Sequence, residues 1–256
     1  MEYSQLIEQL IKIADIASKK VMEIYQTDFQ VRTKEDNSPI TEADLASHRV
    51  ITDGLKKLTP DIPILSEESA NAPWEERKNW TRFWLVDPID GTKEFTNRTD
   101  EFTVNIALIE NGEPVMGVVT APALNEAYWG IKGQGAWKRE ADGSKRELRV
   151  VEPAGAIRAV ASKSHMNEDT RHFIEQLGEH ELVQAGSSLK FCRIAEGKAD
   201  IYPRLGPTCE WDTGAAHAVL VAAGGKVTQL DGRPLVYGKE DVLNPYFIAS
   251  GAWYNS

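Results

Sequence analysis

Two aspartates three positions apart follow an apolar run, in the string Asp87-Pro88-Ile89-Asp90-Gly91-Thr92. Pro88 favours a turn and Gly91 permits close backbone approach, so the two carboxylates can converge with the Ile89 carbonyl between them. Oxygen-only ligands of this kind suit a hard cation such as Mg²⁺. Exposed amides near Gly91 and Thr92 could contact a phosphate, especially where a helix begins. The alternative is an ordinary Asp-Pro turn with a solvated second aspartate.

Three further acidic positions lie beside predicted elements. Glu67 follows the apolar run 62–65, Asp212 precedes one predicted helix, and Asp44 stands near the start of another. Each also has a structural explanation: a solvated loop for Glu67, a helix N-cap for Asp212, and a capping box with Thr41 for Asp44. For Asp212 both roles are compatible, because a helix N-terminus in a cleft also favours anions.

The elements that must position these residues begin with two helices. Apolar residues at three- and four-residue steps predict an amphipathic helix over about 6–24. A second helix is predicted from about Thr41 to 58, and Pro60 ends it. The polar residues 33–38 between them predict a loop or flexible hairpin.

The centre of the chain is predicted to be an antiparallel meander. Its short apolar runs predict buried strands, and Asn111-Gly112 suits the tight turn of a hairpin. The predicted strands are 62–65, 83–86, 102–109, 114–120, 127–129, 136–138 and 148–151.

After about residue 155 strand-like and helical runs alternate, which favours a mixed or parallel sheet. Gly197 and Gly224 are placed to end two of the helices. The predicted strands are 157–161, 182–185, 200–202 and 226–229, and the predicted helices are 168–177, 189–196 and 213–223. We expect an N-terminal α+β half, residues 1–150, and a C-terminal α/β half, residues 151–256, forming one functional unit.

Composition limits the class of protein. The 256 residues are 41% hydrophobic and carry a net charge of −10, which disfavours nucleic-acid polymers but permits a small anionic substrate beside a bound metal. Cys192 and Cys209 have no zinc spacing, and we expect reduced thiols. No signal peptide opens the chain, and no apolar run approaches the roughly 20 residues of a membrane span. We expect a cytoplasmic protein; peripheral attachment to the inner membrane and the oligomeric state stay open.

Taken together, the acidic strings resemble the inositol monophosphatase superfamily of lithium-sensitive, Mg²⁺-dependent phosphatases. The matching strings span nearly the whole chain in the family's order: Thr41–Asp44, Ser-Glu-Glu-Ser at 66–69, Asp-Pro-Ile-Asp-Gly-Thr at 87–92 and Trp-Asp-Thr-Gly-Ala-Ala at 211–216. The resemblance implies a layered αβαβα sandwich of the α+β and α/β classes. In that fold an antiparallel N-terminal sheet and a mixed C-terminal sheet have helices between them and outside them.

The resemblance also implies roles for individual residues. Asp44 and Thr92 would activate the attacking water, and the amides of Gly91 and Thr92 would contact the phosphate. Two or three Mg²⁺ ions would be held by Glu67, Asp87, Ile89 (through its carbonyl), Asp90 and Asp212.

Within the superfamily the chain is most similar to the bacterial 3′(2′),5′-bisphosphate nucleotidases, on the strings 34–44, 187–197 and 200–204. That similarity implies removal of the 3′-phosphate from adenosine 3′,5′-bisphosphate, giving AMP and phosphate; action on the sulfated precursor stays open. Lys190 and Arg204 suit the second phosphate, although either can equally be a solvated surface cation. The residues expected to face the substrate are Glu67, Gly91, Thr92, His165, Ser187, Lys190, Arg204 and Asp212.

Two other functions stay open. One is another activity of the same superfamily, on inositol monophosphate or fructose 1,6-bisphosphate. The other is a non-enzymatic regulator that binds Mg²⁺ or a nucleotide and kept the fold. The pair Asp44 and Thr92 argues against a regulator, because a pure binder needs no group that activates water.

Overall fold

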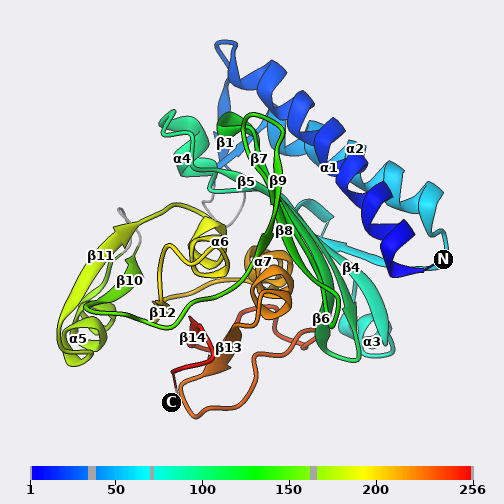
Figure 1. Ribbon diagram of the computed structural model, residues 1–256. Helices are drawn as coiled ribbons and strands as arrows, with labels where there is room; N and C mark the ends of the chain where they lie inside the picture. The colour runs from blue at the N-terminus through cyan, green and yellow to red at the C-terminus, as the bar shows by residue number, and fades with distance from the viewer. Residues whose placement is uncertain (1, 34–38, 70–71, 162–165, 255–256) are drawn as a thin grey trace.

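The computed structural model describes residues 2–33, 39–69, 72–161 and 166–254. The chain stacks in five layers, which confirms the predicted αβαβα arrangement (Figure 1). Helices α1 (Tyr3–Tyr25) and α2 (Glu42–Leu58) cover the outer face of a seven-stranded sheet. Helices α6 (Leu189–Ala195) and α7 (Glu210–Ala222) lie between this sheet and a five-stranded one, and α5 (Glu168–Gln176) packs beyond the second sheet.

The seven-stranded sheet has the order β3-β4-β5-β6-β7-β8-β9 and is antiparallel except for the parallel pair β3–β4. The predicted hairpin turn is confirmed, since Asn111 and Gly112 both have positive φ, 50° and 80°. The strands are β3 (Ile64–Ser66), β4 (Arg82–Asp90), β5 (Thr103–Glu110), β6 (Glu113–Ala121), β7 (Glu126–Ile131), β8 (Gly135–Arg139) and β9 (Lys145–Leu148).

Strand β9 ends where the sequence analysis expected a strand to begin, so the predicted strand 148–151 was wrong. A tight turn at 140–144, in which the Gly143 N–H donates to the Glu140 carbonyl, brings residues 145–148 back against β8. Val150 instead donates its N–H to the Ala223 carbonyl beyond the end of α7.

The five-stranded sheet has the order β11-β10-β12-β14-β13 and is mixed, as predicted. Strand β10 is parallel to both its neighbours, whereas β14 is antiparallel to β12 and β13. The sequence analysis missed β14, a four-residue strand near the C-terminus. The strands are β10 (Ile157–Ala161), β11 (His180–Gln184), β12 (Ile201–Arg204), β13 (Lys226–Gln229) and β14 (Phe247–Ser250).

Each face of the seven-stranded sheet buries its own hydrophobic core. Successive residues of β4 alternate between the two: Trp84 and Val86 pack toward α1 and α2, and Leu85 packs toward α6 and α7. Helix α7 lies close against β6, because a Cβ on Gly117 would come within 2.2 Å of the Ala215 carbonyl oxygen. This close packing fixes the start of α7 relative to the sheet.

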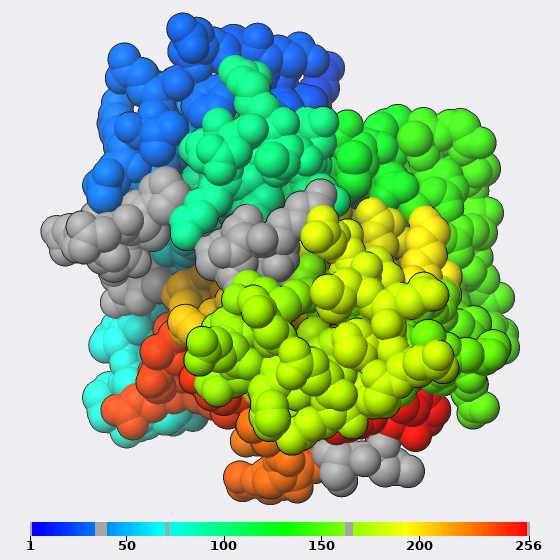
Figure 2. Space-filling model, turned by 90° about the vertical axis from the view of Figure 1, so that its left-hand side faces the viewer, coloured from blue at the N-terminus to red at the C-terminus, as the bar shows by residue number. Residues whose placement is uncertain are grey.

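Smaller elements complete the chain. Strands β1 (Val31–Thr33) and β2 (Pro39–Thr41) pair antiparallel, and the short helices are α3 (Trp74–Arg77), α4 (Thr92–Thr96) and the 3₁₀ turns η1 (Glu67–Ser69) and η2 (Pro122–Leu124). Both cysteines are free. Within the described ranges no helix combines the length and the apolar character needed to cross a membrane. Figure 2 shows the blue helices and α4 at the top of one face and yellow-green segments of the C-terminal half below them.

Candidate active site

Asp87 and Asp90 lie at the end of a bulged strand and not in a turn, so the predicted end of the strand at Val86 was wrong. Strand β4 continues to Asp90, and its register with β5 shifts between Asp87 and Asp90. Pro88 has no N–H to donate to the ladder, which favours such an irregularity. The Ile89 N–H donates to Asp87 Oδ1 at 3.0 Å, so the bulge is closed by one of the two carboxylates.

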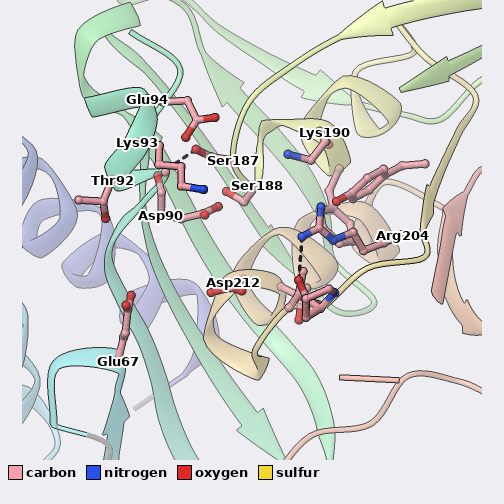
Figure 3. A pocket seen from close by; sticks show the side chains of 16 residues that line it. Glu67, Asp90, Thr92, Lys93, Glu94, Ser187, Ser188, Lys190, Arg204 and Asp212 are labelled. Atoms are coloured by element: carbon pink, nitrogen blue, oxygen red, sulfur yellow. Dashed lines mark hydrogen bonds between the residues drawn. The ribbon is translucent and has the colours of Figure 1, made fainter. Parts of the chain in front are cut away.

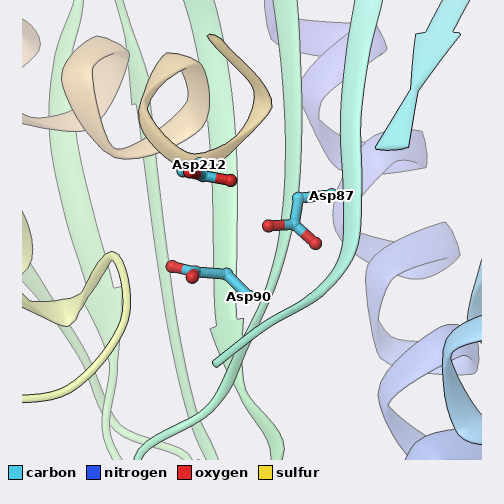
Figure 4. Close-up of side chains that lie close together, drawn as sticks. All are labelled: Asp87, Asp90 and Asp212. Carbon is cyan, nitrogen blue, oxygen red and sulfur yellow. The ribbon is translucent and has the colours of Figure 1, made fainter. Parts of the chain in front are cut away.

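Asp212 reaches the same place from the first turn of α7. The helix begins at Glu210, three residues earlier than predicted, so Asp212 is not the N-cap. It is the third helical residue, and its Oδ2 accepts the Cys209 N–H at 2.8 Å. One carboxylate oxygen from each of Asp87, Asp90 and Asp212 lies within 4.8 Å of the others (Figure 4).

Glu67 joins these three because of strand register. Ser66 pairs with Val86 in the parallel pair β3–β4, so the next residue of each strand, Glu67 and Asp87, lie side by side. The two carboxyl groups share a side-chain hydrogen bond. We refer to Glu67, Asp87, Asp90 and Asp212 as the acidic cluster.

The carboxylates of the acidic cluster repel one another electrostatically. Burial, and then the carboxylates of Glu67, Asp90 and Asp212, raise the pKa of Asp87 well above its ordinary range. Burial also raises the pKa of Asp90 to about 6 and, together with Asp90, the pKa of Asp212 to about 8. The donors are all oxygen atoms, they lie close together, and their ionisation is unfavourable. Such a set fits a hard divalent cation, because its positive charge would offset the repulsion between the carboxylates.

Asp44 and Thr92, the predicted catalytic pair, come together beside the acidic cluster. Asp44 is 2% exposed, and its Oδ2 accepts hydrogen bonds from the Thr41 N–H at 2.7 Å and the Thr41 hydroxyl at 2.6 Å, which confirms the capping box. Its Oδ1 lies 3.4 Å from Thr92 Oγ1, which is also 3.4 Å from the Ile89 carbonyl oxygen. The capping role and a role in the site therefore use different oxygens of one carboxylate.

The acidic cluster opens into a cleft of about 420 Å³ with cations on its far wall (Figure 3). Lys190 is 7% exposed, and its ammonium lies 5.5 Å from the centre of the Tyr202 ring. It makes no hydrogen bond or ion pair with the residues that the structure describes. Burial lowers the pKa of Lys190 to about 8 against the opposing effect of Asp90. Arg204 donates to the Pro207 carbonyl at 2.7 Å, while its buried Nε has no partner in the described parts of the chain.

Three other predicted substrate residues have different outcomes. The Ser187 hydroxyl lies 2.9 Å from the Asp90 carbonyl oxygen and 2.7 Å from the Glu101 carbonyl oxygen, so it holds the loop to the sheet. Gly91, with φ of 89°, must remain glycine, because a Cβ there would lie 2.1 Å from Ser187 Oγ. His165 falls outside the described residues.

Sequence reasoning missed eight of the sixteen residues that line the cleft, and among them are Ser188 and Tyr202, which contact predicted site residues. Ser188 makes a backbone hydrogen bond to the Asp90 carboxylate, a role for which its side chain gives no signal. Tyr202 forms the floor under Lys190. Its place in an apolar strand pattern predicted burial but not contact with a ligand.

Comparison with known proteins identifies the family of the chain. The sequence model of the inositol monophosphatase family matches residues 2–254. The chain is 48% identical over 248 residues to the 3′(2′),5′-bisphosphate nucleotidase CysQ of Escherichia coli K12 (96% of this chain, 99% of that protein) and 49% identical over 245 residues to that of Salmonella typhimurium (94% and 98%).

Solved structures of the same family have the same fold. CysQ from Bacteroides thetaiotaomicron, a bacterial member of the inositol monophosphatase family, superposes with a TM-score of 0.87 at 39% identity, covering 98% of this chain and 99% of that one. An inositol monophosphatase of Thermotoga maritima gives 0.77 at 28% identity, covering 96% and 92%. The chain belongs to the inositol monophosphatase family, and within it is most like the bacterial 3′(2′),5′-bisphosphate nucleotidases.

Proposed function

We propose that this chain is a Mg²⁺-dependent phosphatase that removes the 3′-phosphate of adenosine 3′,5′-bisphosphate, giving AMP and inorganic phosphate. One observation carries the proposal: the cleft sets the acidic cluster opposite Lys190 and Arg204, and among the described residues the Lys190 ammonium has no ion pair and Arg204 Nε has no hydrogen-bond partner. A substrate with two phosphates can place one at each wall. The names of relatives at 48–49% identity support the same substrate.

The cation would be held by the four carboxylates of the acidic cluster and the Ile89 carbonyl. When bound, Mg²⁺ supplies positive charge for the phosphate oxygens and makes a water acidic enough to attack. The oxygen-only donor set, and carboxylates whose pKa values are raised by burial and mutual repulsion, support a site of this kind.

The chain's own residues then orient the nucleophile. One carboxylate oxygen of Asp44 accepts hydrogen bonds from Thr41. The other accepts a hydrogen bond from the Thr92 hydroxyl. Thr92 Oγ1 is left with lone pairs to accept a hydrogen from a water, and the proton passes through Thr92 to Asp44 as the water attacks phosphorus. The 3.4 Å contact is long for a hydrogen bond, as is common in substrate-free sites, and shortens when the nucleophile is in place.

The cationic wall of the cleft would orient the substrate. Lys190 and Arg204 would bind the 5′-phosphate, and the ring of Tyr202 excludes water beneath Lys190. Attack in line with the 3′-oxygen needs no covalent enzyme intermediate, because the 3′-oxygen leaves with the electron pair of the P–O bond and takes a proton from solvent. A role in nucleotide recycling during sulfur assimilation, with action on the sulfated precursor as well, would follow from this substrate. Retention in the cytoplasm would fit the same role.

Phosphate release from adenosine 3′,5′-bisphosphate, inositol 1-phosphate and fructose 1,6-bisphosphate tests the proposal. With Mg²⁺ we expect the first to be hydrolysed with the highest kcat/KM, and we expect EDTA to stop the reaction. Faster release from either of the other two would assign the chain to another activity of its superfamily. No release from any of them would favour a regulator.

A further inference from the structure

Helix α2 contacts the site at three points along one face. Asp44 faces the start of α4, and the next turn carries Ser47 and His48. The Ser47 hydroxyl donates to the Pro88 carbonyl at 2.8 Å, and His48 Nδ1 lies 2.9 Å from Ser66 Oγ. Positions three and four apart share a helix face, so a single rigid element holds three separate segments of the site.

The contact between His48 and Ser66 lies next to a carboxylate of the acidic cluster. Ser66 is fully buried and is the last residue of β3. Ser66 faces α2, where its hydroxyl meets His48, whereas Glu67, the first residue of η1, lines the cleft beside Asp87. Any displacement of Ser66 therefore moves Glu67 relative to Asp87.

The hydrogen bond from His48 forms with the ring in either tautomer, because a serine hydroxyl can donate or accept. His48 itself does not line the cleft. His48 is half-buried, and its ring nitrogen is directed at the fully buried hydroxyl of Ser66.

We propose that His48 is a positioning residue of the metal site, which holds Glu67 against Asp87 through its hydrogen bond to Ser66. The inference goes beyond the reaction and rests on the proposed cation site. Groups that support metal ligands in this indirect way typically change metal affinity by about 10–100-fold when removed. Ser47 holds the Pro88 carbonyl from the same helix and assists.

Calorimetric titration of the metal-free full chain with Mg²⁺ tests the proposal without measuring turnover. We expect His48→Ala and Ser66→Ala each to raise the Kd about tenfold. The double variant should be no weaker than either single variant, because both remove the same link. His48→Gln should restore most of the affinity, since an amide can still hydrogen-bond Ser66. His172→Ala, the same change at an exposed position of α5, should leave the Kd unchanged.

Three results would overturn the proposal. The first is an unchanged Kd in His48→Ala, including the case where only the thermal stability of the metal-free chain falls. The second is losses that add in the double variant. The third is a wild-type chain that binds no divalent cation, which would also remove the metal site from the proposed function, whereas the first two leave it standing. If His48→Ala does not fold, the Kd of Ser66→Ala is compared with that of His48→Gln. We expect the Kd to rise in the first and to stay close to wild type in the second.

Discussion

Two groups of buried charged side chains in the described part of the chain can be compared, the acidic cluster and a second group around Glu196. In the second group Lys138 and Glu196 have fully buried side chains, yet each charge has partners of opposite sign. Lys138 Nζ lies 2.6 Å from Glu126 Oε1, and Arg146 lies 2.8 Å from Glu196 Oε2. We refer to this group as the Glu196 ion cluster: Glu126, Lys138, Glu140, Arg146, Arg193, Glu196 and Lys198.

The two clusters differ in charge balance. The Glu196 ion cluster has three carboxylates and four cations, and it joins β7, β8 and β9 to the end of α6. The pKa of Glu196 is lowered, with Arg193 the chief cause opposing burial, whereas the pKa of Asp212 is raised to about 8. Removing one partner from buried charges that are balanced within the chain is costly, whereas buried like charges repel one another and are relieved by a bound proton or cation.

The largest effect expected is on turnover. Asp90→Asn should lower phosphate release by about 10³-fold or more, because charge stabilisation by the cation is worth several kcal/mol. The same change should leave the free energy of unfolding of the metal-free chain equal or higher, since it removes one repelling charge. Asp231→Asn, at an exposed position, is the control. Near-normal turnover in Asp90→Asn would remove Asp90 from the metal site.

The Glu196 ion cluster should respond in the opposite way. Glu196→Gln leaves cations without their shared partner, so the free energy of unfolding should fall by about 3–5 kcal/mol in urea denaturation. Glu147→Gln, which breaks an exposed pair with Arg149, should change it by less than about 1 kcal/mol. If Glu196→Gln is as stable as wild type, the Glu196 ion cluster does not stabilise the fold, and the proposed difference between the two clusters is wrong.

The cationic wall should affect binding more than chemistry. Lys190→Ala should raise the KM for adenosine 3′,5′-bisphosphate by about 10–100-fold, since a hydrogen bond to a charged group is worth about 1.5–3 kcal/mol. The KM for adenosine 3′-monophosphate should change little, because that substrate lacks the second phosphate. The exposed Lys57→Ala serves as control. Equal losses on the two substrates would exclude Lys190 as the anchor.

The last effect expected is on the pH dependence of stability. Folding raises the pKa of Asp90 to about 6 and that of Asp212 to about 8, so the folded chain holds protons that the unfolded chain has already released. In EDTA the thermal stability should therefore fall from about pH 4 to pH 8. Saturating Mg²⁺ should reduce this fall, because it binds the ionised carboxylates of the folded chain. If the Tm of the metal-free chain rises from about pH 4 to pH 8, the proposed repulsion between the carboxylates of the acidic cluster is contradicted.

The sequence by itself determined most elements of this protein, and its resemblance to a family indicated the four carboxylates that form the acidic cluster. Periodicity predicted α1, the spacing of Thr41 and Asp44 predicted the capping box of α2, and turn chemistry predicted the hairpin at Asn111-Gly112, because these signals are local. The strings around Asp87 and Asp212 marked the carboxylates before any geometry was known. The division at residue 150 and the number of ions remain predictions.

Only the tertiary structure decided how these residues meet. The extension of β4 to Asp90 depends on pairing with β5, and β14 is a strand because β12 and β13 flank it. Glu67 faces Asp87 because of a register that no local signal specifies, and Ser187 is used by two carbonyls from distant segments. Long-range pairing and burial set these positions, and the free energy of each depends on partners far away in the chain.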